Sequence, residues 1–140
     1  MDKIVFDKNK LKVKSRETSV EEVSRLKLVE RLKASNATAW TDGCGLAAVQ
    51  IGVNVRFAWF IYKGTEHTLL NPEIIFKIGK YTHEEGCLSI PNNYSNVVRY
   101  DEIEYITGGK KRKAKGHKAA IIQHEIDHMN GVIITDKEAL

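Results

Sequence analysis

The sequence contains no long hydrophobic run. None of its apolar segments approaches the roughly 20 residues that a helix needs to cross a bilayer. The N-terminus, Met1–Val5, also lacks the apolar core of a signal peptide. Cysteine is scarce, because the two residues present could form one disulfide at most, and nothing else indicates an oxidising compartment. We therefore expect a cytoplasmic protein with no membrane partner.

A strong charge of either sign is also absent. Lys and Arg number 22 and Asp and Glu 18, which leaves a net charge of +4. An excess this small permits weak attraction to RNA or ribosomes but does not predict a specific nucleic-acid partner. Residues 110–118 hold six basic residues in nine, a pattern that more often forms a solvated stretch than a binding patch.

No internal repeat, low-complexity tract or domain boundary interrupts the 140 residues, and the GxGxxG pattern of phosphate-binding loops is missing. The hydrophobic content of 42% and the charged content of 29% are ordinary for a globular protein. We expect residues 1–140 to form one domain around one core.

The most informative stretch is Gln123–His128, with the sequence QHEIDH, inside an apolar run that begins near Ala119. In a helix, residues four apart project from one face, so His124 and His128 can bind a single metal ion. Glu125 lies beside them as a base for a water molecule on that ion. The alternative is a charged, solvated turn that matches the pattern by chance. The apolar neighbours favour a buried helix, where these polar groups need partners or a metal.

A candidate third ligand lies in the segment Glu84–Pro91. Two histidines alone leave a metal under-coordinated, and the thiolate of Cys87 would complete three protein ligands and leave a fourth position for water. The alternative is a buried, inert thiol, which is the commoner role of an isolated cysteine.

The remaining patterns predict a scaffold. Ser19 and Glu22 form a capping-box pattern that begins a helix ending near Ser35-Asn36. Strands are expected over 51–61, over 67–80 as a pair around Asn71-Pro72, and over 97–107, with a turn at Gly108-Gly109. Gly43 and Gly45 either make a tight turn into a strand or let the backbone approach a ligand closely.

Three separated segments resemble one known family. GCGLAAVQ at 43–50, EGCLS at 85–89 and QHEIDH at 123–128 match, in order, the signature motifs of the peptide deformylases. The resemblance extends from about Thr18 to Ile134. It implies an α+β fold with antiparallel strands packed around a central helix that carries HExxH, over a single catalytic domain.

This resemblance also implies an activity. The expected enzyme is a metal-dependent amide hydrolase that removes the N-formyl group from the N-terminal formyl-methionine of nascent polypeptides and releases formate. Cys87, His124 and His128 would bind one divalent metal ion. Fe²⁺ is the expected ion, and Zn, Ni or Co would substitute for it. Glu125 would act first as general base and then as general acid.

The resemblance assigns the remaining site residues as well. The side-chain amide of Gln50 and the backbone N–H of Leu88 would stabilise the oxyanion. Gly45 would bind the backbone of the N-formylmethionyl peptide, and Ala120 and Ile121 would line the methionine pocket. Outside this set, Asp127 and Arg99 are expected to be structural, and Cys44 a bystander.

The chain departs from the family pattern in two places. It ends at Leu140, twelve residues after His128, where bacterial members usually continue into a further helix. Asn92–Tyr94 stand where many members carry an arginine or another polar residue that holds the substrate. We expect a monomer whose contact with nascent chains at the ribosome would not use a C-terminal helix. So short a chain is also compatible with a virus or a reduced genome.

Two other functions remain open. An HExxH metallopeptidase would use the same helix, but such enzymes usually take His or Glu as the third ligand rather than a residue like Cys87. A non-catalytic, ribosome-associated metal-binding homologue would need neither Glu125 nor Gln50, and both are present.

Overall fold

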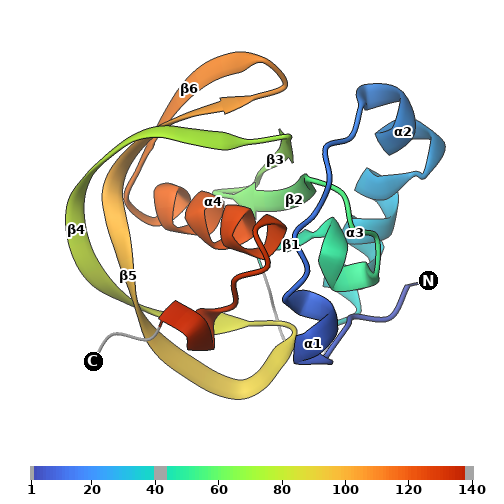
Figure 1. The fold of residues 1–140 in the computed structure, drawn as a ribbon, viewed down its shortest axis with the longest axis horizontal. Coiled ribbons are helices and arrows are strands. Elements are labelled where there is room, and N and C mark those ends of the chain that lie inside the picture. Colours follow the sequence, from blue (N-terminus) through green and yellow to red (C-terminus); the bar gives the residue numbers. More distant parts are fainter. Residues whose placement is uncertain (1, 40–43, 138–140) are drawn as a thin grey trace.

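A computed structural model describes residues 2–39 and 44–137 of the chain (Figure 1). In chain order the elements are α1 (Lys8–Leu11), α2 (Val20–Arg25), α3 (Leu28–Ala37), β1 (Gly45–Ala47), the 3₁₀ helix η1 (Ala48–Ile51), β2 (Phe57–Tyr62), β3 (Thr65–Leu70), β4 (Glu73–Cys87), β5 (Ile90–Thr107), β6 (Lys110–Lys115), α4 (Gly116–Met129) and the 3₁₀ helix η2 (Ile134–Lys137). Within these described ranges, no helix is long and apolar enough to cross a membrane.

Two antiparallel sheets enclose α4. One sheet has the strand order β1-β2-β3 and the other β4-β5-β6. Strands β4 and β5 form one long hairpin, from Glu73 opposite Ile106 to Cys87 opposite Ile90. Figure 1 shows this hairpin curving around α4, which also contacts β1 and β2 of the other sheet. The predicted α+β class, with antiparallel strands around a central helix, is confirmed.

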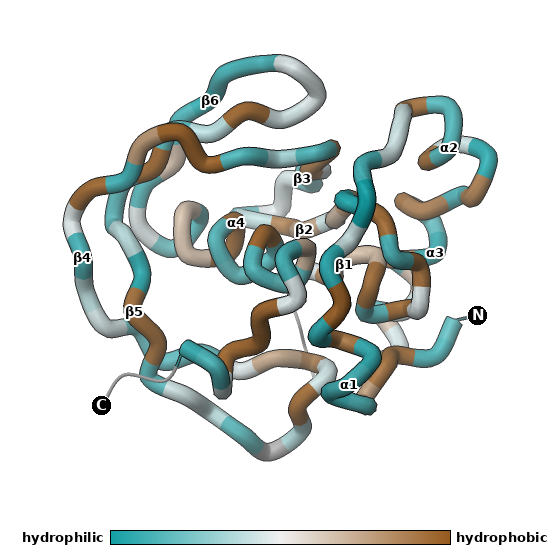
Figure 2. The backbone as a smooth tube through the Cα atoms, viewed as in Figure 1, coloured by the Kyte–Doolittle hydropathy of each residue, from teal (hydrophilic) through white to brown (hydrophobic). Residues whose placement is uncertain are grey.

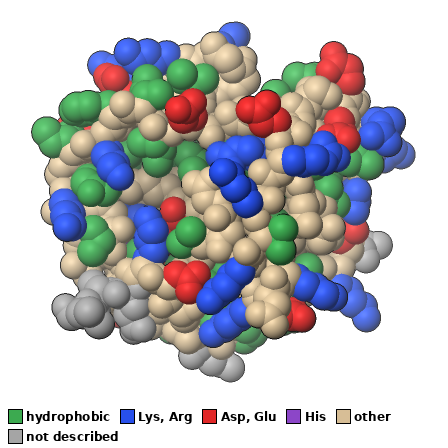
Figure 3. All heavy atoms as spheres, viewed as in Figure 1, with side chains coloured by type: hydrophobic (Ala, Val, Ile, Leu, Met, Phe, Trp, Pro, Cys, Tyr) green, Lys and Arg blue, Asp and Glu red, His purple; other side chains and the backbone are tan. Residues whose placement is uncertain are grey.

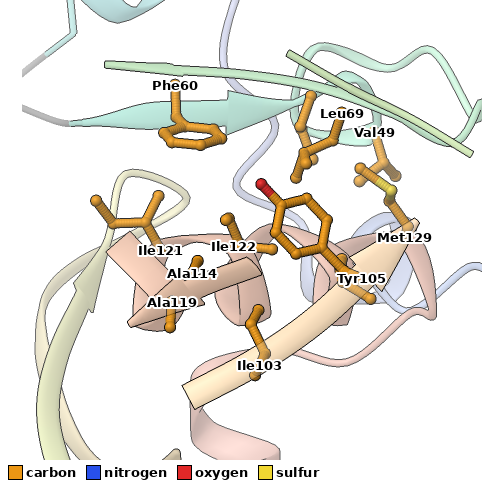
Figure 4. Close-up of a cluster of buried hydrophobic side chains, with 13 residues drawn as sticks. Val49, Phe60, Leu69, Ile103, Tyr105, Ala114, Ala119, Ile121, Ile122 and Met129 are labelled. Atoms are coloured by element: carbon orange, nitrogen blue, oxygen red, sulfur yellow. The ribbon is translucent and has the colours of Figure 1, made fainter. Parts of the chain in front are cut away.

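The central position of α4 follows from its apolar residues. Figure 4 shows Ile122 between Phe60 of the first sheet and Ile103 of the second. All three side chains are at most 1% exposed. Burying a side chain of this size stabilises the fold by roughly 1.5–3 kcal/mol. Figure 2 shows hydrophobic residues interspersed with hydrophilic ones along β4 and β5. Buried residues alternate with less buried ones in β5, as in a strand with one buried face, whereas most of β4 is exposed.

The predicted helix that begins at Ser19 is two helices in the structure. The cap itself is confirmed, because the Glu22 amide donates to Ser19 Oγ at 3.1 Å. Between α2 and α3, however, Lys27 has a left-handed φ of 53°. Leu26 and Leu28 are two residues apart and would point to nearly opposite sides of one continuous helix. The break lets Leu28 become fully buried.

The predicted strand over 51–61 is wrong in its first half. Residues 48–51 form η1, and only the second half of the segment belongs to β2. The cause is Gly52, whose left-handed φ of 84° follows the 3₁₀ turn. The two expected strands around Asn71-Pro72 do exist, but β3 and β4 belong to different sheets and do not pair with each other. Asn71 turns the chain with a φ of 47°.

The predictions for the last third of the chain are largely confirmed. β5 contains residues 97–107 but begins earlier, and the turn at Gly108-Gly109 has positive φ at both glycines. Residues 110–118 are regular structure, because β6 is followed directly by α4. Exposed Lys and Arg side chains nevertheless line β6. On the face shown in Figure 3, Lys and Arg are spread among Asp and Glu rather than gathered in one patch.

Candidate active site

The last residues of β4 carry three functional groups on one face. Side chains alternate between the two faces of a strand, so His83, Glu85 and Cys87 point the same way. Glu85 and Cys87 are each 8% exposed, whereas Glu84 and Gly86, the residues that precede each of them, are exposed. The strand therefore presents an imidazole, a carboxylate and a thiol to α4.

The opposing face is a stripe along α4. His117, Ala120, Ile121, His124 and His128 are spaced by one, three or four residues and lie on one side of the helix. This confirms the helix inferred from QHEIDH.

The two faces meet at a cluster of atoms that could bind a metal ion. Cys87 Sγ lies 3.4 Å from His128 Nε2, which lies 3.2 Å from His124 Nε2. All three donor atoms are within 4.8 Å of one another. A tetrahedral site with bonds of about 2.0–2.3 Å places its ligand atoms about 3.3–3.6 Å apart. One sulfur and two imidazole nitrogens at these separations fit a single divalent ion.

A buried carboxylate orients the first histidine. His124 Nδ1 lies 2.9 Å from Glu85 Oε1, so the proton is expected on Nδ1 and the lone pair on Nε2, which faces the cluster. Arg99 holds Glu85 in turn through two hydrogen bonds of 2.7 Å, and a third bond of 2.6 Å joins Arg99 to Asp127. His128 lacks such a partner, because within the described residues its buried Nδ1 has no hydrogen bond.

Electrostatics in this cluster favour a thiolate at Cys87 and a carboxylate at Glu85. Burial raises the pKa of the Cys87 thiol, but His128 and His124 outweigh burial and hold that pKa well below its usual range. The thiolate is the form that binds metals. Burial likewise raises the pKa of Glu85, but Arg99 and then His124 lower it far below its ordinary value, so Glu85 is ionised.

Glu125 lies beside the cluster in a dry environment. Its side chain is 2% exposed, and its Oε1 has no hydrogen-bond partner in the described part of the chain. Burial raises the pKa of this carboxyl, which suits a group that first takes and later returns a proton. A Cβ atom at Gly45 would lie 2.9 Å from Glu125 Oε2 and 2.6 Å from Phe60 Cβ. Only glycine allows β1 to pass this close; Gly43 lies outside the described residues.

Gln50 reaches the cluster from η1. Its Oε1 accepts the Ala47 amide at 3.0 Å, and its Nε2 donates to Ser89 Oγ at 3.0 Å. The Ala47 N–H can only donate, so its bond defines which end of the Gln50 amide is oxygen. The same Nε2 lies 3.6 Å from Cys87 Sγ. An N–H donor is therefore held next to the metal ligands, on a side chain that is 1% exposed.

A pocket of about 270 Å³ opens beside these groups. Its lining includes eight of the nine residues predicted from the sequence: Gly45, Gln50, Cys87, Leu88, Ala120, Ile121, His124 and Glu125. The ninth, His128, is 1% exposed and reaches the site through its contact with Cys87. The structure thus brings together segments that are far apart in the chain.

Comparison with known proteins decides the family. The profile of the family described as polypeptide deformylase matches residues 1–139. The chain belongs to the peptide deformylase family. Enzymes of this family are metal-dependent hydrolases that remove the N-formyl group from nascent peptides.

The similarity to individual relatives covers different shares of the two chains. The chain is 42% identical over 112 residues to peptide deformylase 1B, chloroplastic, of Oryza sativa, covering 71% of this chain but only 41% of the rice protein. It is 37% identical over 135 residues to peptide deformylase of Dictyoglomus turgidum, covering 91% and 84%. The crystal structure of peptide deformylase from Thermotoga maritima superposes with a TM-score of 0.89 at 30% identity, covering 100% of this chain and 99% of that chain.

Sequence reasoning missed the residues that support the candidate site. Glu85 lies inside the EGCLS motif, yet it received no role, although alternation along a strand places it on the face of Cys87. Ser89, which binds Gln50, and Gln123, which hydrogen-bonds both backbone groups of Tyr100, were also missed. No local pattern signals these contacts, because their partners lie 23 or 39 residues away.

Replacing Arg99 with Met should destabilise the protein severely. The Arg99 side chain is 2% exposed and neutralises both Glu85 and Asp127. Removing one member of a buried ion pair costs about 3–5 kcal/mol, and here Glu85 would stay buried without its guanidinium partner. Urea denaturation of the purified variant measures the loss.

Arg16→Met is the matched control. Arg16 also forms two hydrogen bonds to one carboxylate, that of Glu22, but it is exposed. Its loss should change the free energy of unfolding little, because water and salt screen the pair. Equal destabilisation by the two substitutions would contradict the importance of burial at Arg99.

Proposed function

We propose that this chain removes the formyl group from N-formylmethionyl peptides at the Cys87, His124 and His128 centre. The observation that carries the proposal is the convergence of these three donor atoms with a buried carboxylate and a buried amide at one pocket. This chain by itself supplies the three candidate ligands, the carboxylate and the amide, so the acting unit in this proposal is a single-domain monomer.

The three ligands leave a coordination position open for chemistry. A divalent ion held there would supply Lewis-acid activation of a water molecule and polarisation of the formyl carbonyl. The Glu85 carboxylate keeps His124 in the ligating tautomer, and Arg99 keeps Glu85 in place.

Glu125 moves the proton. Its carboxylate accepts a proton from the attacking water as the C–O bond forms at the formyl carbon. It then delivers that proton to the amine nitrogen as the C–N bond breaks, which releases formate and the free peptide amine. The dry setting of Glu125 supports this role, because no fixed partner among the described residues competes for Oε1.

The oxyanion formed on the formyl group needs hydrogen-bond donors. Gln50 Nε2 is held beside Cys87 by its bond to Ser89, so it can donate to the oxyanion without a costly rearrangement. The backbone N–H of Leu88, in the turn that follows Cys87, is the second proposed donor. Ala120 and Ile121 line the pocket next to the metal ligands and would receive the methionine side chain, while Gly45 would bind the peptide backbone.

Formate release tests this function directly. The protein, prepared without oxygen, should release formate from formyl-Met-Ala-Ser and leave the internal amide bonds intact. Cleavage of an unformylated peptide would instead support a metallopeptidase. Metal binding without either reaction would support the non-catalytic alternative.

The proposed resident ion is Fe²⁺, and this choice predicts sensitivity to air. Iron(II) in an open site reacts with oxygen, and the Cys87 thiolate is itself readily oxidised. One apo-protein preparation, reconstituted with each metal and assayed over hours with and without oxygen, measures the effect. The iron form should lose activity in air, whereas the Ni and Co forms should stay active because these ions hold the divalent state.

The zinc form should have lower turnover than the iron, nickel or cobalt forms. A zinc form that is the most active, together with an iron form that is stable in air, would contradict the iron assignment. It would leave the assignment of the three protein ligands untouched.

A further inference from the structure

The far end of the pocket carries a second pair of histidines that the proposed reaction does not use. His83 precedes Glu85 and Cys87 on the inward face of β4, and His117 begins the pocket-facing stripe of α4. Both line the pocket. Their ring centroids lie 5.8 Å apart. The pocket between β4 and α4 therefore has the candidate ligand His124 at one end and the pair His83 and His117 at the other.

These two histidines differ in their hydrogen bonds. His83 Nδ1 lies 3.1 Å from Glu85 Oε2, so this ring is held by the carboxylate that also orients His124. Among the described residues, the His117 ring contacts those of His83 and Tyr62 but forms no hydrogen bond. A neutral imidazole always carries one N–H, and nothing in this part of the chain determines which nitrogen of His117 holds it.

His117 lies where the end of the substrate's methionine side chain is expected. It precedes Ala120 and Ile121 by three and four residues on one face of α4. The helix rises about 10 Å from His117 to His124. A formyl-methionine that starts at the metal ligands and extends along Ala120 and Ile121 therefore directs its sulfur toward His117.

We propose that His117 donates a hydrogen bond to an oxidised methionine side chain, so that peptides beginning with N-formylmethionine sulfoxide are a second substrate class. This inference rests on the proposed function. Oxidation turns the apolar thioether into a polar S=O group, and a pocket with only apolar walls would bury that oxygen without a partner, at a cost. The N–H of His117 offers a donor on the same face of α4 as Ala120 and Ile121.

The sulfoxide predicts a stereochemical signature. Oxidation makes the sulfur chiral, and a donor on one wall of the pocket favours the epimer whose oxygen faces that wall. The wild-type protein should therefore hydrolyse one epimer faster than the other. If His117 only shaped the pocket, the preference for one epimer would not depend on whether residue 117 carries an N–H group.

The experiment measures kcat/KM for formyl-Met(O)-Ala-Ser, with the two epimers separated, against formyl-norleucine-Ala-Ser as an apolar reference of similar shape. The readout is the ratio of the favoured epimer to the reference, since changes at the metal affect both substrates alike. His117→Leu should lower this ratio about tenfold, the effect of losing one hydrogen bond, and should bring the two epimers together. His117→Gln keeps an N–H donor and should retain more of the ratio.

His67→Leu is the matched control, because it removes an imidazole that stacks on Phe60 and does not line the pocket. The ratio should stay at its wild-type value in this variant. Equal rates for both epimers in the wild type, or an equal loss of the ratio in the Leu and Gln variants, would overturn the role of His117. Failure to release formate from formyl-Met-Ala-Ser would overturn the proposed function instead.

Discussion

Replacing Glu125 with Gln should remove nearly all turnover while the protein keeps its fold and its metal. The amide has almost the same shape as the carboxylate but cannot accept the proton of the attacking water. Positioned acid–base groups typically contribute 10²–10⁴-fold in rate, and we expect a loss of about that size. Formate release measures the rate, and elemental analysis of the same sample measures the metal.

Stability separates loss of chemistry from loss of structure. Burial already disfavours the charged form of Glu125, as its raised pKa indicates. A neutral amide should therefore leave the urea midpoint unchanged or raise it. Glu21→Gln, an exposed change on α2, is the control for removing one carboxylate. Turnover of the Glu125 variant within tenfold of wild type would refute its role as the base.

Replacing Cys87 with Ser should remove the metal, and the activity with it. A neutral hydroxyl is a much poorer ligand than a thiolate. In this protein the His128 and His124 imidazoles hold the pKa of Cys87 low, so the thiolate is available before a metal binds. Metal content after dialysis against a mild chelator should fall well below one ion per chain.

Cys44→Ser tests whether any cysteine would have this effect. Cys44 is exposed, and its sulfur is not one of the three clustered donor atoms. Its substitution should leave the metal content at the wild-type level. A Cys87 variant with full metal content and full activity would rule out the proposed centre.

The local spacing of the sequence determined the core of the site. His124 and His128 lie on one face of α4 because residues four apart always do so in a helix. The Ser19 cap and the turn at Gly108-Gly109 were predictable for the same reason, since each depends on a few adjacent residues. For Cys87 the residues alone left two interpretations open, a metal ligand or a buried, inert thiol. Only the family motifs indicated the metal ligand.

Only the tertiary structure decided how these pieces are supported. Glu85 meets His124 across 39 residues, and Arg99 joins Glu85 to Asp127. Such contacts depend on which strands pair and in what register, which is set by packing of the whole chain rather than by local periodicity. The same holds for the break at Lys27 and for the meeting of His83 with His117. The sequence by itself determined which groups could do the chemistry, and packing around α4 decided which residues hold them in place.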